Sequence, residues 1–85
     1  MQQVEIYTKA TCPYCWRAKQ LLTQKGIDFT EIGVDWGGPE KQTMIQRAGG
    51  RMTVPQIFIG DRHVGGCDDL FDLERAGKLD ALIAA

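Results

Sequence analysis

The junction between a short strand and the run Cys12-Pro13-Tyr14-Cys15 constrains the fold of this chain more than any other feature. The segment Val4-Glu5-Ile6-Tyr7 alternates apolar and polar residues and is rich in strand formers, so it predicts a first strand ending near Thr8. Proline suits the first position of a helix, because the N–H that it lacks would have no partner there. The sequence therefore predicts a strand, a short loop and a helix that has Cys12 at its N-terminus.

The same helix should carry Cys15 on its apolar side. Ala18, Leu21 and Leu22 recur behind this cysteine at helical spacing, and Gly26 is placed to end the helix as a C′ glycine. Trp16 lies on the opposite side of the helix, so we expect it to be partly exposed beside the cysteine pair.

The remaining periodicity predicts the order β-α-β-α-β-β-α and a mixed four-stranded sheet with helices on both faces. The first two strands are joined by a helix and should be parallel, whereas Gly60-Asp61 predicts a tight antiparallel hairpin between the last two. The expected elements after the first helix are a strand over 27–34, a helix over 39–48, strands over 54–59 and 62–64, a helix capped by Asp68 or Asp69, and a last short turn or helix containing Leu79, Leu82 and Ile83.

The length of the chain restricts it to one hydrophobic core. Eighty-five residues are too few for two domains, so we expect residues 1–85 to form a single domain. Hydrophobic residues make up 44% of the chain and only three residues are cysteine, which indicates a core held by apolar packing and not by disulfides.

Charge and hydropathy argue against nucleic acid and membrane as partners. The net charge is −1 and the basic residues are dispersed, so no cluster could neutralise several phosphates at once. No window approaches the length of a membrane span, and the N-terminal segment has no basic patch, apolar run or cleavage site. Together with the odd cysteine count, this predicts a cytoplasmic protein in a reducing compartment.

Two cysteines separated by two residues at a helix N-terminus are typical of thiol-disulfide exchange. The free backbone N–H groups of the first turn favour the thiolate of Cys12 over the thiol, and Lys9 could add a nearby positive charge. A thiolate attacks a disulfide sulfur and forms a mixed disulfide. Cys15, one turn further along the helix, could then displace the substrate.

A zinc site is the alternative use of two cysteines at this spacing. Structural zinc sites need four ligands, and the only other candidates are Cys67 and His63, which no pair spacing joins. We therefore favour redox chemistry, expect no metal ligands in the chain, and interpret His63 as structural.

Four segments resemble the bacterial dithiol glutaredoxins, in particular those of the glutaredoxin-3 type. The resemblance covers essentially the whole chain and implies a thioredoxin-like fold. The segments that carry it are Val4-Glu5-Ile6-Tyr7-Thr8-Lys9, Thr11-Cys12-Pro13-Tyr14-Cys15, Thr53-Val54-Pro55-Gln56-Ile57-Phe58-Ile59 and Gly65-Gly66-Cys67-Asp68-Asp69-Leu70.

The resemblance implies a glutathione site beside the cysteine pair. In such proteins the proline that matches Pro55 is cis, and the backbone of the residue matching Val54 pairs with glutathione in the manner of a β-strand. One end of the groove should bind the glycine carboxylate and the other the γ-glutamyl group, at a helix N-terminus. The residues expected to bind glutathione are Lys9, Tyr14, Thr53, Val54, Pro55, Gly66, Cys67 and Asp68. Arg47 and Arg51 could also reach a carboxylate, but nothing in their spacing selects either.

The implied activity is reduction of protein disulfides through Cys12 and Cys15, and of protein-glutathione mixed disulfides through Cys12 alone. Glutathione is then the co-substrate, glutathione reductase and NADPH act indirectly, and no bound cofactor is required. The resemblance thus implies electron transfer in cellular redox homeostasis, and we expect the protein to be a monomer.

Two other functions compete with this one. A glutaredoxin-like redoxin reduced by thioredoxin reductase would lack the residues Gly66-Cys67-Asp68, which are present here. An iron–sulfur dimer would use one Cys12 thiolate from each chain, but Pro13 stiffens the loop that such a cluster must approach.

Overall fold

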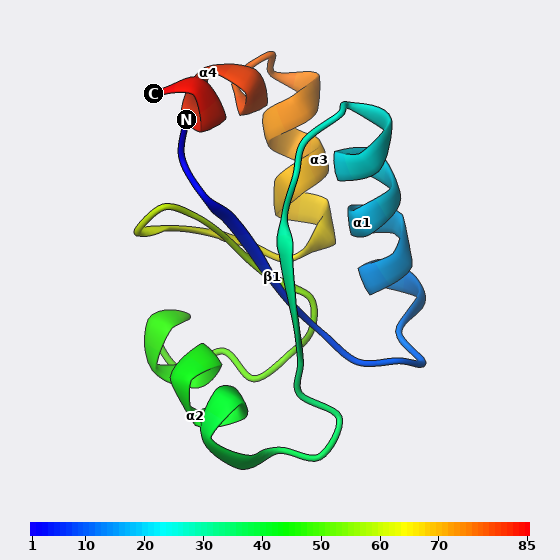
Figure 1. Ribbon diagram of the computed structural model, residues 1–85, viewed down its shortest axis with the longest axis vertical. Helices are drawn as coiled ribbons and strands as arrows, with labels where there is room; N and C mark the ends of the chain where they lie inside the picture. Colours follow the sequence, from blue (N-terminus) through cyan, green and yellow to red (C-terminus); the bar gives the residue numbers. More distant parts are fainter.

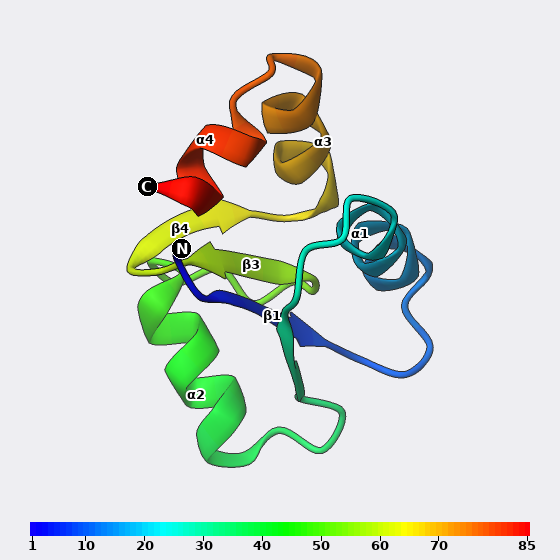
Figure 2. The same ribbon diagram turned by 45° about the horizontal axis from the view of Figure 1, so that its top comes forward.

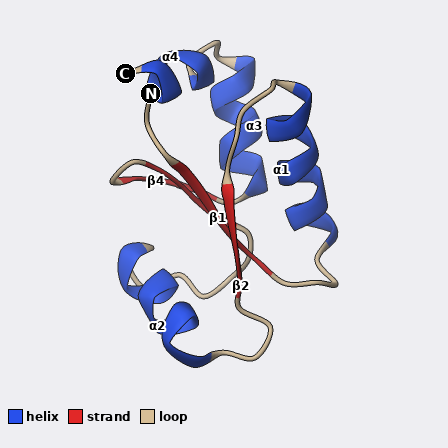
Figure 3. Ribbon diagram, viewed as in Figure 1, coloured by secondary structure: helices blue, strands red, loops and turns tan.

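The computed structural model describes residues 1–85, in which four strands form one sheet of order β2-β1-β3-β4 (Figure 1). Figure 3 shows the same chain coloured by secondary structure. The elements are β1 (Val4–Thr8), α1 (Pro13–Gln24), β2 (Thr30–Gly33), α2 (Gly38–Arg47), β3 (Gln56–Ile59), β4 (Arg62–Gly65), α3 (Cys67–Arg75) and α4 (Leu79–Ala84).

The strand pairing confirms the predicted mixed sheet. β1 and β2 are parallel, with Tyr7 opposite Ile32, and the hairpin β3–β4 is antiparallel. β1 also pairs with β3 in antiparallel register, with Ile6 opposite Ile57. Strand β1 therefore lies inside the sheet, and the loop that follows it leads to Cys12.

Two predicted strands begin later than expected, for local reasons. β2 was expected from Ile27 but begins at Thr30, because the Ile27 N–H still bonds to the Leu22 carbonyl at 2.9 Å and closes the end of α1. Gly26 has a φ of 70° there, as its predicted place at the C-terminal end requires. β3 begins at Gln56 and not at Val54, because proline at position 55 has no N–H to donate to a neighbouring strand.

The helices cover both faces of the sheet, as the periodicity of the sequence predicted. α1, α3 and α4 lie on one face and α2 lies on the other (Figures 1 and 2). Because side chains alternate along a strand, Ile6 and Ile57 face the three helices, whereas Tyr7 and Phe58 face α2. The first face holds a cluster of 10 buried residues and the second a cluster of five.

Candidate functional site

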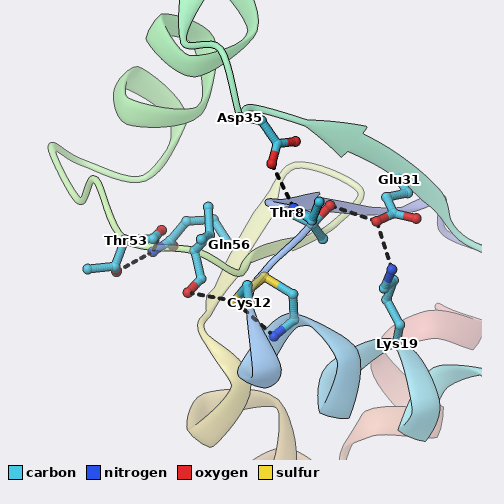
Figure 4. Close-up of a disulfide and its surroundings, with 10 residues drawn as sticks. Thr8, Cys12, Lys19, Glu31, Asp35, Thr53 and Gln56 are labelled. Carbon is cyan, nitrogen blue, oxygen red and sulfur yellow. Dashed lines mark hydrogen bonds and ion pairs between the residues drawn. A yellow bond between two sulfur atoms is a disulfide. The ribbon is translucent and has the colours of Figure 1, made fainter.

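Cys12 occupies the N-cap position of α1, directly before Pro13. Its Sγ accepts a hydrogen bond from the Cys15 N–H at 3.1 Å. The two cysteine sulfurs lie at disulfide distance and their Cα atoms are 5.2 Å apart (Figure 4). This confirms the predicted location of the pair at the start of a helix, with a backbone N–H directed at the first sulfur.

The two thiols have different surroundings. Cys12 is partly exposed, whereas Cys15 is 0% exposed and packs on the apolar side of α1. Burial, followed by the hydrogen bond with Cys12, raises the pKa of the Cys15 thiol to about 12. In the reduced pair Cys15 therefore stays protonated at neutral pH, which leaves Cys12 as the sulfur able to attack first.

Two acidic side chains hold the backbone that leads to Cys12. The Ala10 N–H donates to Asp35 Oδ1 at 2.7 Å, which ties the loop after β1 to the end of β2 (Figure 4). Glu31 accepts from the Thr8 hydroxyl at 2.7 Å and from Lys19 Nζ at 2.9 Å. These two bonds lower the pKa of Glu31, so the ionised carboxylate links β1, β2 and α1 at neutral pH.

The segment before β3 approaches Cys12 from the other side. The Val54–Pro55 bond is cis, as the resemblance implied, and Val54 makes no backbone–backbone hydrogen bond. Cys12 Sγ lies 3.7 Å from the Val54 carbonyl oxygen. The backbone N–H of Val54 thus remains available to a ligand beside the reactive sulfur.

A pocket with a volume of about 300 Å³ opens next to this contact. Its lining comes from the start of α1, the segment before β3 and the start of α3. The lining residues are Tyr14, Arg51, Thr53, Val54, Pro55, Gly66, Cys67, Asp68 and Asp69. All the residues predicted to bind glutathione are among them except Lys9, which is partly buried outside the pocket lining.

The N-terminus of α3 forms one end of the pocket. Gly66 is the N-cap, and Asp69, not Asp68, provides the cap, because Asp69 Oδ2 accepts from the Gly66 N–H at 2.9 Å. The side chain of Asp68 is exposed and is free of any hydrogen bond within the chain. The first-turn N–H groups of α3 and a free carboxylate therefore lie side by side in the pocket wall.

Sequence reasoning missed Arg51 and Asp69 as pocket residues. Arg51 Nη1 lies 3.5 Å from Asp69 Oδ2, across the start of α3. Nothing local could select Arg51 over Arg47, because only the tertiary fold separates them. Arg47 instead lies over the Phe58 ring, 4.0 Å from its centroid, on the α2 face of the sheet.

Tyr14 and Cys67 line the pocket, whereas Trp16 and His63 lie outside its lining. Tyr14 and Trp16 are 58% and 54% exposed, so Trp16 is exposed beside the cysteine pair as predicted. Cys67 is buried, and burial raises the pKa of its thiol. His63 bonds to Gln56 and is not a pocket residue.

Two further findings concern the chain as a whole. No group of three or more His, Cys, Asp or Glu side chains is arranged to hold a metal ion. No helix combines the length and apolar character needed to span a membrane.

Comparisons with known proteins agree with this geometry. The Glutaredoxin family model matches residues 4–64. A glutaredoxin from Pseudomonas aeruginosa is 64% identical over 85 residues, covering 100% of both chains, and glutaredoxin 3 from Escherichia coli K12 is 55% identical over 83 residues, covering 98% of this chain and 99% of the relative. The crystal structure of a buckwheat glutaredoxin–glutathione complex superposes with a TM-score of 0.86 at 32% identity, covering 98% of this chain and 77% of that one.

Proposed function

Because the chain belongs to the glutaredoxin family, we propose that it is a glutathione-dependent thiol-disulfide oxidoreductase that works in the cytoplasm. Its substrates would be protein disulfides and protein-glutathione mixed disulfides. The observation that carries the proposal is the pocket, which has Val54 and the start of α3 in its wall and lies beside Cys12 Sγ.

The chemistry of the pocket suits glutathione. The tripeptide carries two carboxylates, one ammonium group and a backbone that can pair like a strand. The free N–H of Val54 would pair with its cysteinyl backbone, and the first turn of α3 would bind the γ-glutamyl carboxylate while Asp68 binds the ammonium group. Lys9 is the candidate partner for the glycine carboxylate, with Tyr14 beside it, whereas Arg51 lies across the start of α3 and is nearer to the γ-glutamyl carboxylate. Thr53, Pro55, Gly66 and Cys67 complete the proposed site.

The monothiol route needs Cys12 alone. The Cys12 thiolate attacks the glutathione sulfur of a protein-glutathione disulfide, and the protein thiolate leaves and takes a proton. The thiolate of a second glutathione attacks the glutathione sulfur of the mixed disulfide, which forms glutathione disulfide and releases Cys12. Glutathione reductase then reduces glutathione disulfide with electrons from NADPH.

The dithiol route also uses Cys15. Cys12 attacks a protein disulfide and one substrate sulfur leaves as a thiolate. Cys15 loses its proton, attacks Cys12 Sγ and displaces the second substrate sulfur, so that the substrate becomes a dithiol and the enzyme a disulfide. Two molecules of glutathione restore the dithiol. The raised pKa of Cys15 fits this order, because Cys15 acts only once Cys12 is already bonded to substrate.

A coupled assay tests the roles. Wild type, Cys12→Ser and Cys15→Ser are supplied with a small glutathione mixed disulfide, glutathione, glutathione reductase and NADPH, and NADPH oxidation is followed. We expect turnover by wild type, none by Cys12→Ser, and retained deglutathionylation by Cys15→Ser. A wild-type protein that is inactive with glutathione but is reduced by thioredoxin reductase would refute the glutathione dependence and leave the role of Cys12 intact.

A further inference from the structure

Gln56 carries the only amide side chain in the core of the protein. It is 0% exposed and lies on the α2 side of β3, outside the pocket lining. Its Nε2 donates to the Thr53 carbonyl oxygen at 2.9 Å and to Thr53 Oγ1 at 3.2 Å (Figure 4). Burying an amide costs free energy unless its hydrogen bonds are made. The bonds of Gln56 therefore identify the groups that its amide holds in place.

The acceptor properties of Thr53 fix the orientation of this amide. A carbonyl oxygen can only accept, so the group that faces it must be the NH₂ of Gln56 and not its oxygen. Gln56 Oε1 then faces His63 Nε2 at 2.7 Å. Because an amide oxygen can only accept, the ring nitrogen must carry a proton and donate it. His63 is held in place by stacking on Phe58, with ring centroids 4.9 Å apart.

The same argument sets the direction of the Thr53 hydroxyl. The amide nitrogen has no lone pair to offer, so Thr53 Oγ1 must be the acceptor in its bond with Gln56. The hydroxyl proton of Thr53 is therefore free to point away from Gln56. Thr53 is exposed and lines the pocket, so this proton is available to a group bound there.

We propose that Gln56 and His63 are positioning residues, which hold Thr53 so that its hydroxyl donates into the pocket toward a carboxylate of the bound peptide. This inference deepens the proposed function and rests on it. His63 fixes the amide of Gln56, the amide donates one hydrogen bond to each side-chain and backbone oxygen of Thr53, and the Thr53 hydroxyl then presents its proton to the pocket. The wall would otherwise present a carbonyl oxygen and a hydroxyl of undefined direction, which suit an anion less well.

Glutathione kinetics of variants at positions 53 and 56 test the proposal in the coupled assay. Gln56→Glu has nearly the same shape but no N–H, so the Thr53 hydroxyl would turn to donate to it. Loss of one hydrogen bond to a charged group predicts an apparent KM for glutathione raised by about tenfold, with kcat within about twofold of wild type. Thr53→Val should raise KM to a similar extent and Thr53→Ser should stay near wild type. The double variant Gln56→Glu/Thr53→Val should have a KM for glutathione no higher than that of the single variant with the higher KM, since both changes remove the same donor.

Variants of His63 separate its hydrogen bond from its packing. His63→Phe keeps a ring against Phe58 but removes the donor, so KM for glutathione should rise. His63→Gln loses the ring but places an N–H near the position of Nε2, so KM should stay closer to wild type. Gln42→Glu, on an exposed part of α2, repeats the charge change of Gln56→Glu and should leave KM unchanged.

The outcomes are distinguishable. Unchanged KM in both Gln56→Glu and Thr53→Val, or additive effects in the double variant, would overturn the positioning role while glutathione turnover by wild type stands. No glutathione turnover by wild type would overturn both this inference and the proposed function. If circular dichroism shows that Gln56→Glu does not fold, the KM for glutathione of the other variants decides the question. Thr53→Val is then compared with Thr53→Ser, and His63→Phe with His63→Gln.

Discussion

The two faces of the sheet are built in different ways. The face covered by α1, α3 and α4 has a continuous apolar cluster of 10 buried residues, of which only Cys67 carries a side-chain heteroatom. The face covered by α2 has a cluster of five buried hydrophobic residues and a set of polar side chains among its aromatic rings. Arg47 donates there to the Tyr7 hydroxyl at 3.1 Å and to Glu5 Oε1 at 2.9 Å.

The difference indicates that one face mainly stabilises the fold and the other mainly orients side chains next to the pocket. Apolar burial is non-directional and scales with area, so the larger face should supply most of the stability. Hydrogen bonds are directional, and those of the α2 face reach the pocket through His63, Gln56 and Thr53. Every buried side-chain nitrogen and oxygen has a partner, so this polar face avoids the cost of unpaired groups.

The largest stability effect should come from the apolar face. Leu22 is 0% exposed in the larger cluster, so Leu22→Ala should lower the free energy of unfolding by about 3 kcal/mol through lost burial and the cavity left behind. Urea unfolding measures this, and Gln20→Ala on the exposed side of α1 should change stability by less than about 0.5 kcal/mol. A loss below about 1 kcal/mol for Leu22→Ala would contradict the role given to this face.

A smaller loss is expected when the polar network on the α2 face is cut. Arg47→Met keeps the apolar stem but removes two hydrogen bonds and leaves the buried Tyr7 hydroxyl without its partner, which should cost about 1–2 kcal/mol. Arg75→Met is the matched control, because Arg75 pairs with Asp72 in solvent and should contribute about 0.5 kcal/mol or less. If Arg47→Met costs as much as Leu22→Ala, the proposed contrast between the faces fails.

The smallest effect should be a pH dependence from His63. Burial, followed by the positive charge of Arg51, lowers the pKa of His63 below its ordinary value of 6.5. Below about pH 6.5 the unfolded chain therefore binds more protons than the folded protein. His63 has no effect on stability well above this pH, and it lowers the free energy of unfolding as the pH falls below it.

Unfolding of wild type and His63→Gln across pH 5–8 isolates this contribution. Carboxylates with a lowered pKa, such as Glu31, also stabilise the fold less as they are protonated in acid. This loss is the same in both proteins, so it cancels in the difference between them. The stability of wild type relative to His63→Gln should fall as pH is lowered. A difference that is constant with pH would show that the ring does not resist protonation in the folded protein.

Local sequence patterns predicted most of the fold and the reactive pair. Alternation gave the strands, helical spacing gave the apolar side of α1, and the Pro13 signal located Cys12 at a helix N-terminus. The errors lie at boundaries, as at β2, where hydrogen bonds closing the end of α1 displace the start of the strand. Such competition between neighbouring elements is decided by geometry that a periodic pattern does not contain.

Long-range assembly explains what the sequence left open at the site. Arg51 and Thr53, from the segment before β3, and Asp69, from α3, converge on one pocket, whereas Lys9, close to Cys12 in sequence, is not part of the lining. The choice of Asp69 over Asp68 as the cap of α3 depends on which side chain can reach back to the Gly66 N–H.

The sequence by itself determined that a cysteine pair opens the first helix, because proline position and hydrophobic period are properties of neighbouring residues. Only the tertiary structure decided which groups face that pair and how they are held. Gln56 and His63 are an example: both are ordinary strand residues in the sequence, and β3–β4 pairing brings the ring nitrogen within 2.7 Å of the amide oxygen. Hydrogen-bond direction depends on such distances and angles, which exist only after the strands have paired.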